Sequence, residues 1–216
     1  MVHDFSDKNS TLQRFIGELR DVDIQKDPLR FRENLKRIGE IFAYEVSQTL
    51  GYEKQEVETP LGIANVNYPK DRVVLATILR AGLPMHQGML NFFDSAENAF
   101  VSAYRMHHKD GTFEIKVEYI SCPNLENSVL IMVDPMLATG ASMEISINAL
   151  KKFGKPKRIH IVAAIASVEG LNNVKRRFPD ADIWIGAVDE ELTARSYIVP
   201  GLGDAGDLSY GKKIQN

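Results

Sequence analysis

Short apolar runs recur along the second part of the chain, and they constrain its fold more than any other feature. Such runs are typical of strands that are buried on both faces of a parallel sheet. They occupy residues 73–79, 99–104, 129–133, 160–166 and 183–188. Segments of helical character separate several of these runs, at about 83–93, 143–153 and 169–177. The alternation predicts an α/β fold with a mostly parallel sheet flanked by helices.

The segment YRMHHKDGTFEIKVEYI departs from this alternation. Asp110-Gly111 is a strong signal for a tight turn, and strand-like residues lie on both sides of it. We predict an antiparallel β-hairpin arm at 105–120 that projects from the sheet and contacts a second subunit. His107 and His108 are interpreted as exposed histidines of this hairpin rather than as metal ligands.

The N-terminal part of the chain contains a long amphipathic helix signal, DPLRFRENLKRIGEIFAYEVSQTLG. Asp27 is a suitable N-cap, Pro28 suits the first turn, and Gly51 is predicted to end the helix. The apolar face of this helix consists of Phe31, Leu35, Ile38, Phe42 and Val46. A shorter amphipathic segment, Thr11–Arg20, precedes it, whereas residues 52–72 are mixed and irregular.

The 216 residues contain no repeat and are predicted to form one domain, 1–216, in which 1–72 is an N-terminal helical and irregular region. A net charge of −3 gives no broad attraction to nucleic acid. Cys122 is the only cysteine, which excludes an internal disulfide and suits a reducing cytoplasm. The start MVHDFSDKNS lacks the features of a secretion signal, and no apolar stretch approaches the ~20 residues that span a bilayer. We therefore expect a cytoplasmic protein that binds neither membranes nor nucleic acid.

The stretch VLIMVDPMLATGASM places a carboxylate at the end of a buried strand and small residues directly after it. Asp134 is expected at the carboxyl edge of the sheet, where open parallel sheets bind ligands. The small residues 138–142 can curl around an anion, and the following helix presents free N–H groups. The motifs GxxxxGK[ST] and GxGxxG are absent here. From this stretch alone, a sugar-phosphate site and a tight strand-to-helix turn with a surface aspartate stay open.

Three stretches together resemble one enzyme family. VDPMLATGAS resembles the signature that binds 5-phosphoribosyl 1-pyrophosphate (PRPP) in type I phosphoribosyltransferases, in the form found in uracil phosphoribosyltransferases. ILRAGL (Ile78–Leu83) and YIVPGLGDAGD (Tyr197–Asp207) match the same family, in its order, and the likeness covers most of residues 25–211. The resemblance implies a type I fold in which N-terminal and C-terminal segments form a hood over the base. It also implies the transfer of ribose 5-phosphate from PRPP to N1 of uracil, giving UMP and pyrophosphate with Mg²⁺ in pyrimidine salvage.

The resemblance also assigns roles to individual residues. Arg80 and Asp204 match catalytic positions, and Mg²⁺ is expected to be held mainly through the pyrophosphate, with no firm protein ligand. The residues implied to bind PRPP are Arg80, Arg105, Asp134, Leu137, Ala138, Thr139, Gly140, Ala141, Ser142 and Asp204. Those implied to bind uracil lie in a base-binding loop at 190–211 and are Ile198, Gly203, Asp204 and Ala205.

Two residues depart from the family pattern. Ala141 replaces a glycine in the phosphate loop, which predicts regular backbone there because alanine does not readily adopt positive φ. Thr77 stands where proline is expected before ILRAGL.

Two other functions stay open at this stage. Some phosphoribosyltransferase folds are RNA-binding regulators, and the acidic net charge argues against that role here. Enzymes of the same fold act on hypoxanthine or orotate, but GLGDAG has no aromatic residue on which a purine would stack. The family resemblance further implies a homodimer or higher homo-oligomer and a GTP effector, whose site no stretch of the sequence locates.

Overall fold

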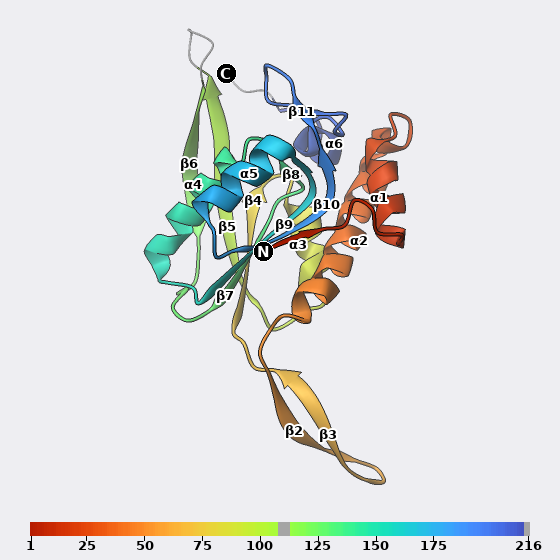
Figure 1. The fold of residues 1–216 in the computed structure, drawn as a ribbon, viewed down its shortest axis with the longest axis vertical. Helices are drawn as coiled ribbons and strands as arrows, with labels where there is room; N and C mark the ends of the chain where they lie inside the picture. Colours follow the sequence, from red (N-terminus) through yellow and green to blue (C-terminus); the bar gives the residue numbers. More distant parts are fainter. Residues whose placement is uncertain (108–112, 214–216) are drawn as a thin grey trace.

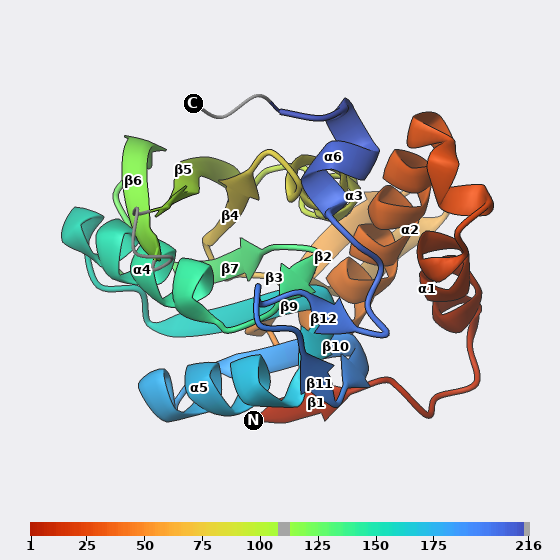
Figure 2. The same ribbon diagram turned by 90° about the horizontal axis from the view of Figure 1, so that it is seen from above.

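One mixed sheet forms the centre of the molecule (Figures 1 and 2). The computed structural model describes the backbone of residues 1–107 and 113–213, and the side chains of these residues apart from 103–107 and 113–116. In spatial order the strands are β1 (Val2–Asp4), β10 (Asp182–Asp189), β9 (Arg158–Ser167), β7 (Val129–Val133), β4 (Val73–Leu79), β5 (Glu97–His107) and β6 (Phe113–Ser121). A short strand, β8 (Met136–Leu137), also pairs with β9. Only the β5–β6 pair of this sheet is antiparallel within the described residues, so the predicted mostly parallel sheet is confirmed.

Helices cover both faces of the sheet, as predicted (Figure 2). One face carries α1 (Thr11–Arg20), the 3₁₀ turn η1 (Ile24–Lys26), α2 (Pro28–Ser47) and α3 (Leu83–Leu90). The other carries α4 (Ala141–Leu150), the 3₁₀ turn η2 (Lys151–Phe153) and α5 (Val168–Arg177), while α6 (Ala205–Tyr210) lies above one edge of the sheet. Side chains alternate between two buried clusters, so Leu75 and Ile131 pack toward the first layer and Val74 and Leu130 toward the second. In the described part of the chain, each helix is too short or too polar to cross a bilayer.

The long N-terminal helix begins as predicted but ends earlier. The Asp27 carboxylate accepts hydrogen bonds from the N–H groups of Leu29 and Arg30, at 2.9 and 3.1 Å. All five residues of the predicted apolar face are buried. The prediction that Gly51 ends the helix is wrong, because α2 stops at Ser47. The Gly51 N–H instead donates to Asp71 Oδ2 at 2.7 Å, at the base of a hairpin.

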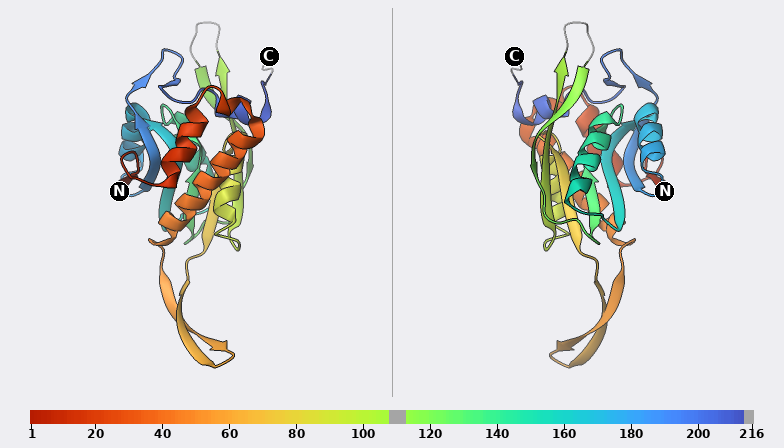
Figure 3. Two further views of the ribbon diagram at one scale, coloured as in Figure 1. Left: turned by 90° about the vertical axis from the view of Figure 1, so that its right-hand side faces the viewer. Right: turned by 90° about the vertical axis from the view of Figure 1, so that its left-hand side faces the viewer.

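Residues 52–72, described above as irregular, contain an ordered hairpin. Strands β2 (Tyr52–Thr59) and β3 (Gly62–Pro69) pair antiparallel, and Thr59 faces Gly62 across the turn. The hairpin extends away from the body at the end opposite α6 (Figures 1 and 3). Nearly every residue in it is exposed on both faces. Apolar and polar residues alternate only in β3, at 64–68, whereas β2 is mostly charged or polar, so the sequence did not indicate a pair of strands here.

The predicted second hairpin is present in β5 and β6. The pairing runs from Phe100 opposite Ser121 to His107 opposite Phe113, and the arm rises beyond the other strands at the end where α6 lies (Figure 1). The predicted turn at Asp110-Gly111 and His108 lie outside the described residues. Contact with a second subunit through this arm stays a prediction.

His160 of β9 is a buried histidine that contacts Trp184 of β10. The His3 ring stacks on Trp184 with 3.7 Å between ring centroids, and the Trp184 indole N–H donates to His160 Nδ1 at 3.1 Å. Burial lowers the pKa of His160 to about 4, and the neighbouring positive charge of Arg158 acts in the same direction. His160 is therefore neutral in the folded protein at neutral pH.

Acid is expected to destabilise the fold through His160. Between pH 6.5 and pH 4 the unfolded chain binds a proton that the folded chain does not, so the free energy of unfolding falls as the pH falls. The full effect of this one group is up to about 3 kcal/mol. Urea unfolding of wild type at pH 7.5 and pH 5 measures the loss. His160→Gln should reduce it, and an unchanged pH dependence in that variant would rule His160 out as the cause.

Candidate active site

The predicted site residues gather at the carboxyl edge of the sheet. Strands β4, β7, β9 and β10 are parallel, so their carboxyl ends meet at the end of the molecule where α6 lies (Figure 1). Thr77 pairs with Val133, which places Arg80 and Asp134 just beyond the ends of two adjacent strands. This edge is where open α/β sheets bind ligands.

The turn between β4 and α3 is tight and depends on a glycine. A Cβ atom at Gly82 would overlap Thr77 Oγ1 and lie 2.9 Å from the Ile78 carbonyl oxygen. The Thr77 hydroxyl donates to the Val133 carbonyl at 3.0 Å, so this residue links the ends of β4 and β7. The peptide between Leu79 and Arg80 is cis. The Gly82 N–H donates to the Ile78 carbonyl at 3.1 Å, so Arg80 lies within this tight turn.

Helix α6 brings Arg80 and Asp204 together. The Arg80 guanidinium donates to Asp207 Oδ1 at 3.2 Å and to the Gly211 carbonyl at 3.4 Å. The Asp204 carboxylate caps α6 by accepting from the Asp207 N–H at 3.0 Å. A Cβ atom at Gly206 would lie 3.2 Å from Asp204 Oδ1 and 3.7 Å from Arg80 Nη2. The two predicted catalytic residues thus flank the same glycine.

Asp207 is a site residue that the sequence analysis did not single out. It pairs with Arg80, and the two side chains remain 29% and 39% exposed. The available signal was its position three residues after Asp204, where an acidic residue suits the first turn of a capped helix.

Asp134 carries a raised pKa. Part of the residue reaches solvent, but protein surrounds the carboxyl group, and this loss of hydration raises its pKa to about 7. The backbone N–H of Met136 acts in the opposite direction and does not compensate. A carboxylate in such surroundings gains from any ligand that donates hydrogen bonds to it.

The residues after Asp134 form a cradle of backbone N–H groups. Ser167 Oγ donates to the Ala138 carbonyl at 2.6 Å, and Asn173 Nδ2 donates to the Thr139 carbonyl at 3.2 Å. With these carbonyls directed toward α5, the N–H groups of the same peptides face the opposite side. Gly140 has φ +80° and forms the N-cap of α4, whose first-turn N–H groups have no partner within the helix.

The structure refines two predictions for this loop, the start of the helix and the role of Leu137. The helix begins at Ala141, two residues before the predicted start at 143, so the regular backbone predicted for Ala141 is confirmed. Leu137 lies in β8 and its side chain is buried in the core. A ligand in this loop would therefore meet the main chain of Leu137.

The glycine-rich segment near the C-terminus is ordered rather than loose. Strands β11 (Glu191–Leu192) and β12 (Ile198–Val199) pair antiparallel, and Gly201 and Gly203 adopt φ +58° and +93°. Ile198 and Ala205 are buried in the same core cluster as α1 and α2. Their side chains are directed into the protein, so they can contact a ligand only through their backbone groups.

The Arg105 backbone lies in β5, three residues beyond Ser102, which pairs with the last residue of β4. Its Cα is therefore past the same carboxyl edge as Arg80, although its side chain is outside the described residues.

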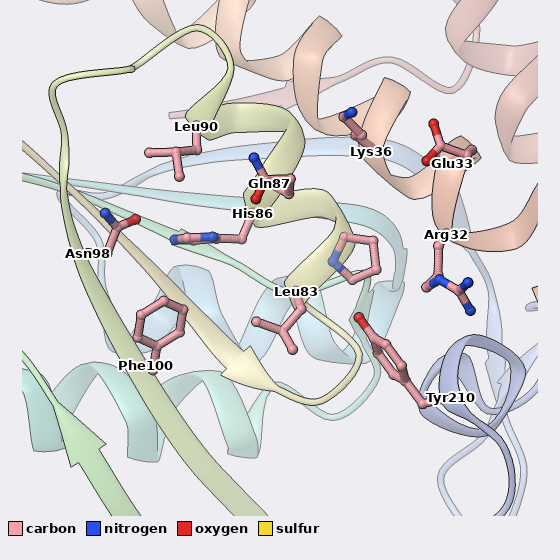
Figure 4. Close-up of a pocket in the computed structure, with 11 residues that line it drawn as sticks. Arg32, Glu33, Lys36, Leu83, His86, Gln87, Leu90, Asn98, Phe100 and Tyr210 are labelled. Atoms are coloured by element: carbon pink, nitrogen blue, oxygen red, sulfur yellow. The ribbon is translucent and has the colours of Figure 1, made fainter. Parts of the chain in front are cut away.

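A cavity of about 530 Å³ lies beside α6, between α2, α3 and β5 (Figure 4). Its lining combines basic residues with rings and includes Arg32, Lys36, His86, Phe100 and Tyr210. None of the predicted site residues lines it. Among the described residues, no group of three His, Cys, Asp or Glu side chains is arranged to hold a metal ion.

The amino-acid sequence resembles those of known proteins over almost the whole chain. The family profile described as uracil phosphoribosyltransferase matches residues 6–212. A uracil phosphoribosyltransferase from Porphyromonas gingivalis is 53% identical over 208 residues, covering 96% of both chains. One from Pyrococcus furiosus is 38% identical over 217 residues, covering 99% of this chain and 91% of the relative.

Solved structures agree with this assignment. The AQ2163 protein from Aquifex aeolicus is 31% identical with a TM-score of 0.88 and complete coverage of both chains. A hypoxanthine phosphoribosyltransferase from Staphylococcus aureus, at 15% identity and a TM-score of 0.50, covers 86% of this chain and 84% of its own. This second likeness shows the fold alone, and the predicted type I phosphoribosyltransferase fold is confirmed. The chain belongs to the uracil phosphoribosyltransferase family.

Proposed function

We propose that this protein transfers ribose 5-phosphate from PRPP to N1 of uracil at the carboxyl edge of the sheet, forming UMP and pyrophosphate for pyrimidine salvage. Family membership supports the reaction. The observation that carries the site is the β7–α4 connection, where one buried carboxylate, Asp134, precedes the backbone N–H groups of residues 138–142, of which that of Ala141 donates to Thr139 Oγ1 at 3.4 Å. That combination suits a ribose hydroxyl pair next to a phosphate.

The two ends of PRPP would bind different parts of this edge. The 5′-phosphate accepts hydrogen bonds from the N–H groups of residues 138–142, and Asp134 accepts hydrogen bonds from the ribose hydroxyls. Arg80, just beyond the end of the adjacent strand β4, would bind the pyrophosphate after exchanging its Asp207 contact for a phosphate oxygen. Arg105 would reach the same substrate from the hairpin arm.

Uracil would be recognised by backbone groups of the C-terminal segment. Its edge presents a carbonyl, an N–H and a carbonyl, which complement one backbone carbonyl and two backbone N–H groups. Ile198 would supply the carbonyl, and Gly203, Asp204 and Ala205 the remaining contacts. Cytosine carries an amino group in place of O4, which would leave a buried donor facing a donor at a cost of about 1–3 kcal/mol.

The rate would come from placement and charge, since the transfer to N1 of uracil needs no nucleophilic side chain of the protein. The anomeric carbon develops positive character as its bond to pyrophosphate breaks, and Arg80 stabilises the departing negative charge. Asp204 and Asp207 lie next to Arg80 and provide carboxylate oxygens, which suits a Mg²⁺ ion bound mainly through pyrophosphate and water. Bound Mg²⁺ supplies further neutralisation of the leaving group.

A base panel tests the proposed function. Purified protein is incubated with PRPP, Mg²⁺ and uracil, cytosine, hypoxanthine or orotate, and both pyrophosphate and nucleotide are measured. We expect turnover with uracil, with UMP as the product. A folded preparation that leaves uracil unchanged would contradict the proposal, and turnover of another base would reassign the substrate. GTP added to the uracil reaction tests the predicted effector.

We also propose that the protein is a cytoplasmic homo-oligomer. The β2–β3 hairpin supports assembly because it exposes apolar side chains without packing on the body, including Leu61, Ile63 and Val66. An isolated two-stranded hairpin is only marginally stable in water, so a second copy that covers it would stabilise it.

Placing a charge on this hairpin is expected to weaken the assembly. Ile63→Asp introduces a carboxylate at a side chain that is 68% exposed in the single chain, so it should leave the monomer folded. Light scattering should report a smaller particle than wild type at the same concentration. Asn65→Asp adds the same charge at another exposed position of β3 and serves as the control. An Ile63→Asp variant with the mass of wild type would exclude the hairpin from the interface.

A further inference from the structure

A partly buried ion pair holds the segment that leads into the proposed uracil site. Arg20 Nη2 donates to Asp189 Oδ1 and Arg20 Nη1 donates to Asp189 Oδ2, both at 2.8 Å. Arg20 Nη1 also donates to the Gly201 carbonyl at 3.0 Å, and the Gly201 N–H donates to Asp189 Oδ2 at 3.0 Å. Both backbone polar groups of Gly201 are therefore bound by the same pair of side chains.

Gly201 sits at the turn on which the uracil contacts depend. It follows β12, which begins with Ile198, and precedes the segment from Gly203 to Ala205. Its φ of +58° is in the left-handed region, and a Cβ atom there would overlap the Ile198 carbonyl oxygen. The position of the Ile198 carbonyl is thus fixed against the Gly201 peptide.

The two side chains come from rigid elements that carry no proposed substrate contact. Arg20 is the last residue of α1, and Asp189 is the last residue of β10. Their side chains are only 22% and 7% exposed. A two-fold hydrogen-bonded Arg–carboxylate pair with this degree of burial has a defined geometry and resists screening by solvent.

We propose that Arg20 and Asp189 are positioning residues for base recognition, which set the Ile198–Gly201 turn so that its backbone carbonyl meets uracil. The inference rests on the function proposed above. The pair acts through the turn and has no direct contact with PRPP, because its hydrogen bonds end at Gly201. The proposed PRPP groups other than Asp204 lie beyond the ends of β4 and β7, on β5 and at the start of α4. Loss of the pair should therefore weaken uracil binding selectively.

Steady-state kinetics with matched variants tests the role. Arg20→Met keeps much of the side-chain volume and removes every hydrogen bond to Asp189 and Gly201. Arg20→Lys retains the charge but cannot make the two-fold contact. Arg30→Met is the control, since Arg30 forms a comparable two-fold pair with Glu18, at 2.8 and 2.9 Å, that joins α2 to α1 away from the turn. Melting temperatures of all three variants report folding.

We expect Arg20→Met to raise the KM for uracil by about tenfold or more, the effect of losing a charged hydrogen bond. Its KM for PRPP should stay within about twofold of wild type, Arg20→Lys should be intermediate, and Arg30→Met should change neither constant. Equal effects on both substrates, or an unchanged KM for uracil in folded Arg20→Met or Arg20→Lys, would overturn the inference. A wild-type protein that does not use uracil would instead refute the proposed function.

Discussion

Asp134→Asn is expected to lower kcat/KM for PRPP by about 100- to 1,000-fold while leaving the protein folded. The carboxylate would accept two hydrogen bonds from the ribose hydroxyls, and hydrogen bonds to a charged group contribute about 1.5–3 kcal/mol each. Asparagine keeps the shape but supplies one neutral acceptor and a donor that faces the hydroxyls. Pyrophosphate release at subsaturating PRPP measures the loss.

The pH dependence of the same reaction gives a second readout of Asp134. Its pKa is raised to about 7, so the protonated form, which accepts hydrogen bonds poorly, accumulates below that pH in the free enzyme. We expect kcat/KM for PRPP to rise with pH through about 7 in wild type and to lose this rise in Asp134→Asn.

Asp134 should also oppose stability at alkaline pH. Between its ordinary pKa of 3.8 and about 7 the folded state binds a proton that the unfolded state releases, so the free energy of unfolding falls as the pH rises across that range. Asp134→Asn is therefore expected to stabilise the unliganded protein at pH 8 by up to about 4 kcal/mol. Asp180→Asn, at an exposed position, is the control for a lost carboxylate.

Turnover near that of wild type in Asp134→Asn would place the ribose elsewhere.

Arg80→Gln is expected to reduce kcat/KM for PRPP by about 100- to 1,000-fold. The guanidinium is the cation that the fold brings to the proposed position of the departing pyrophosphate, and removal of one group that stabilises developing negative charge has effects of this size. Stability should change little, because the pair with Asp207 is more than a quarter exposed on both sides.

Arg177→Gln provides a matched comparison for this variant. Arg177 pairs with Glu144 at 3.2 Å, the same separation as the Arg80–Asp207 pair, and its side chain is 58% exposed. Arg177 is the last residue of α5, and its partner Glu144 follows residues 138–142 in the first turn of α4, so its loss should change both kinetic constants far less than the loss of Arg80. Equal activity of Arg80→Gln and Arg177→Gln would mean that Arg80 does not meet the pyrophosphate.

The sequence predicted those parts of the fold in which buried residues form a recognisable pattern, either a continuous apolar run or one apolar face of a helix. The apolar runs at 73–79 and 129–133 coincide with β4 and β7, and the capped apolar face starting at Asp27 coincides with α2. The β2–β3 hairpin was not predicted, because neither of its faces is buried in this chain. The end of α2 was predicted wrongly because glycine is common just after a helix, whereas Gly51 lies four residues beyond the last helical residue, Ser47.

For the site, the motifs identified the loops but not their contacts. Asp134 and the start of α4 follow from a strand, small residues and a helix in sequence. The pairing of Arg80 with Asp207 joins residues 127 positions apart, and the Arg20–Asp189 pair joins residues 169 apart. Such contacts depend on the packing of α6 and α1 against the sheet, which no local pattern encodes. The raised pKa of Asp134 likewise depends on atoms that surround it only in the folded chain.

A crystal structure of the protein with UMP is the most direct test of how this edge of the sheet binds its ligand. We predict that the 5′-phosphate oxygens lie within hydrogen-bonding distance of the backbone N–H groups of residues 138–142, with both ribose hydroxyls on the Asp134 carboxylate. A nucleotide whose phosphate occupies any other part of the molecule, including the cavity lined by Arg32 and Lys36, would contradict the account.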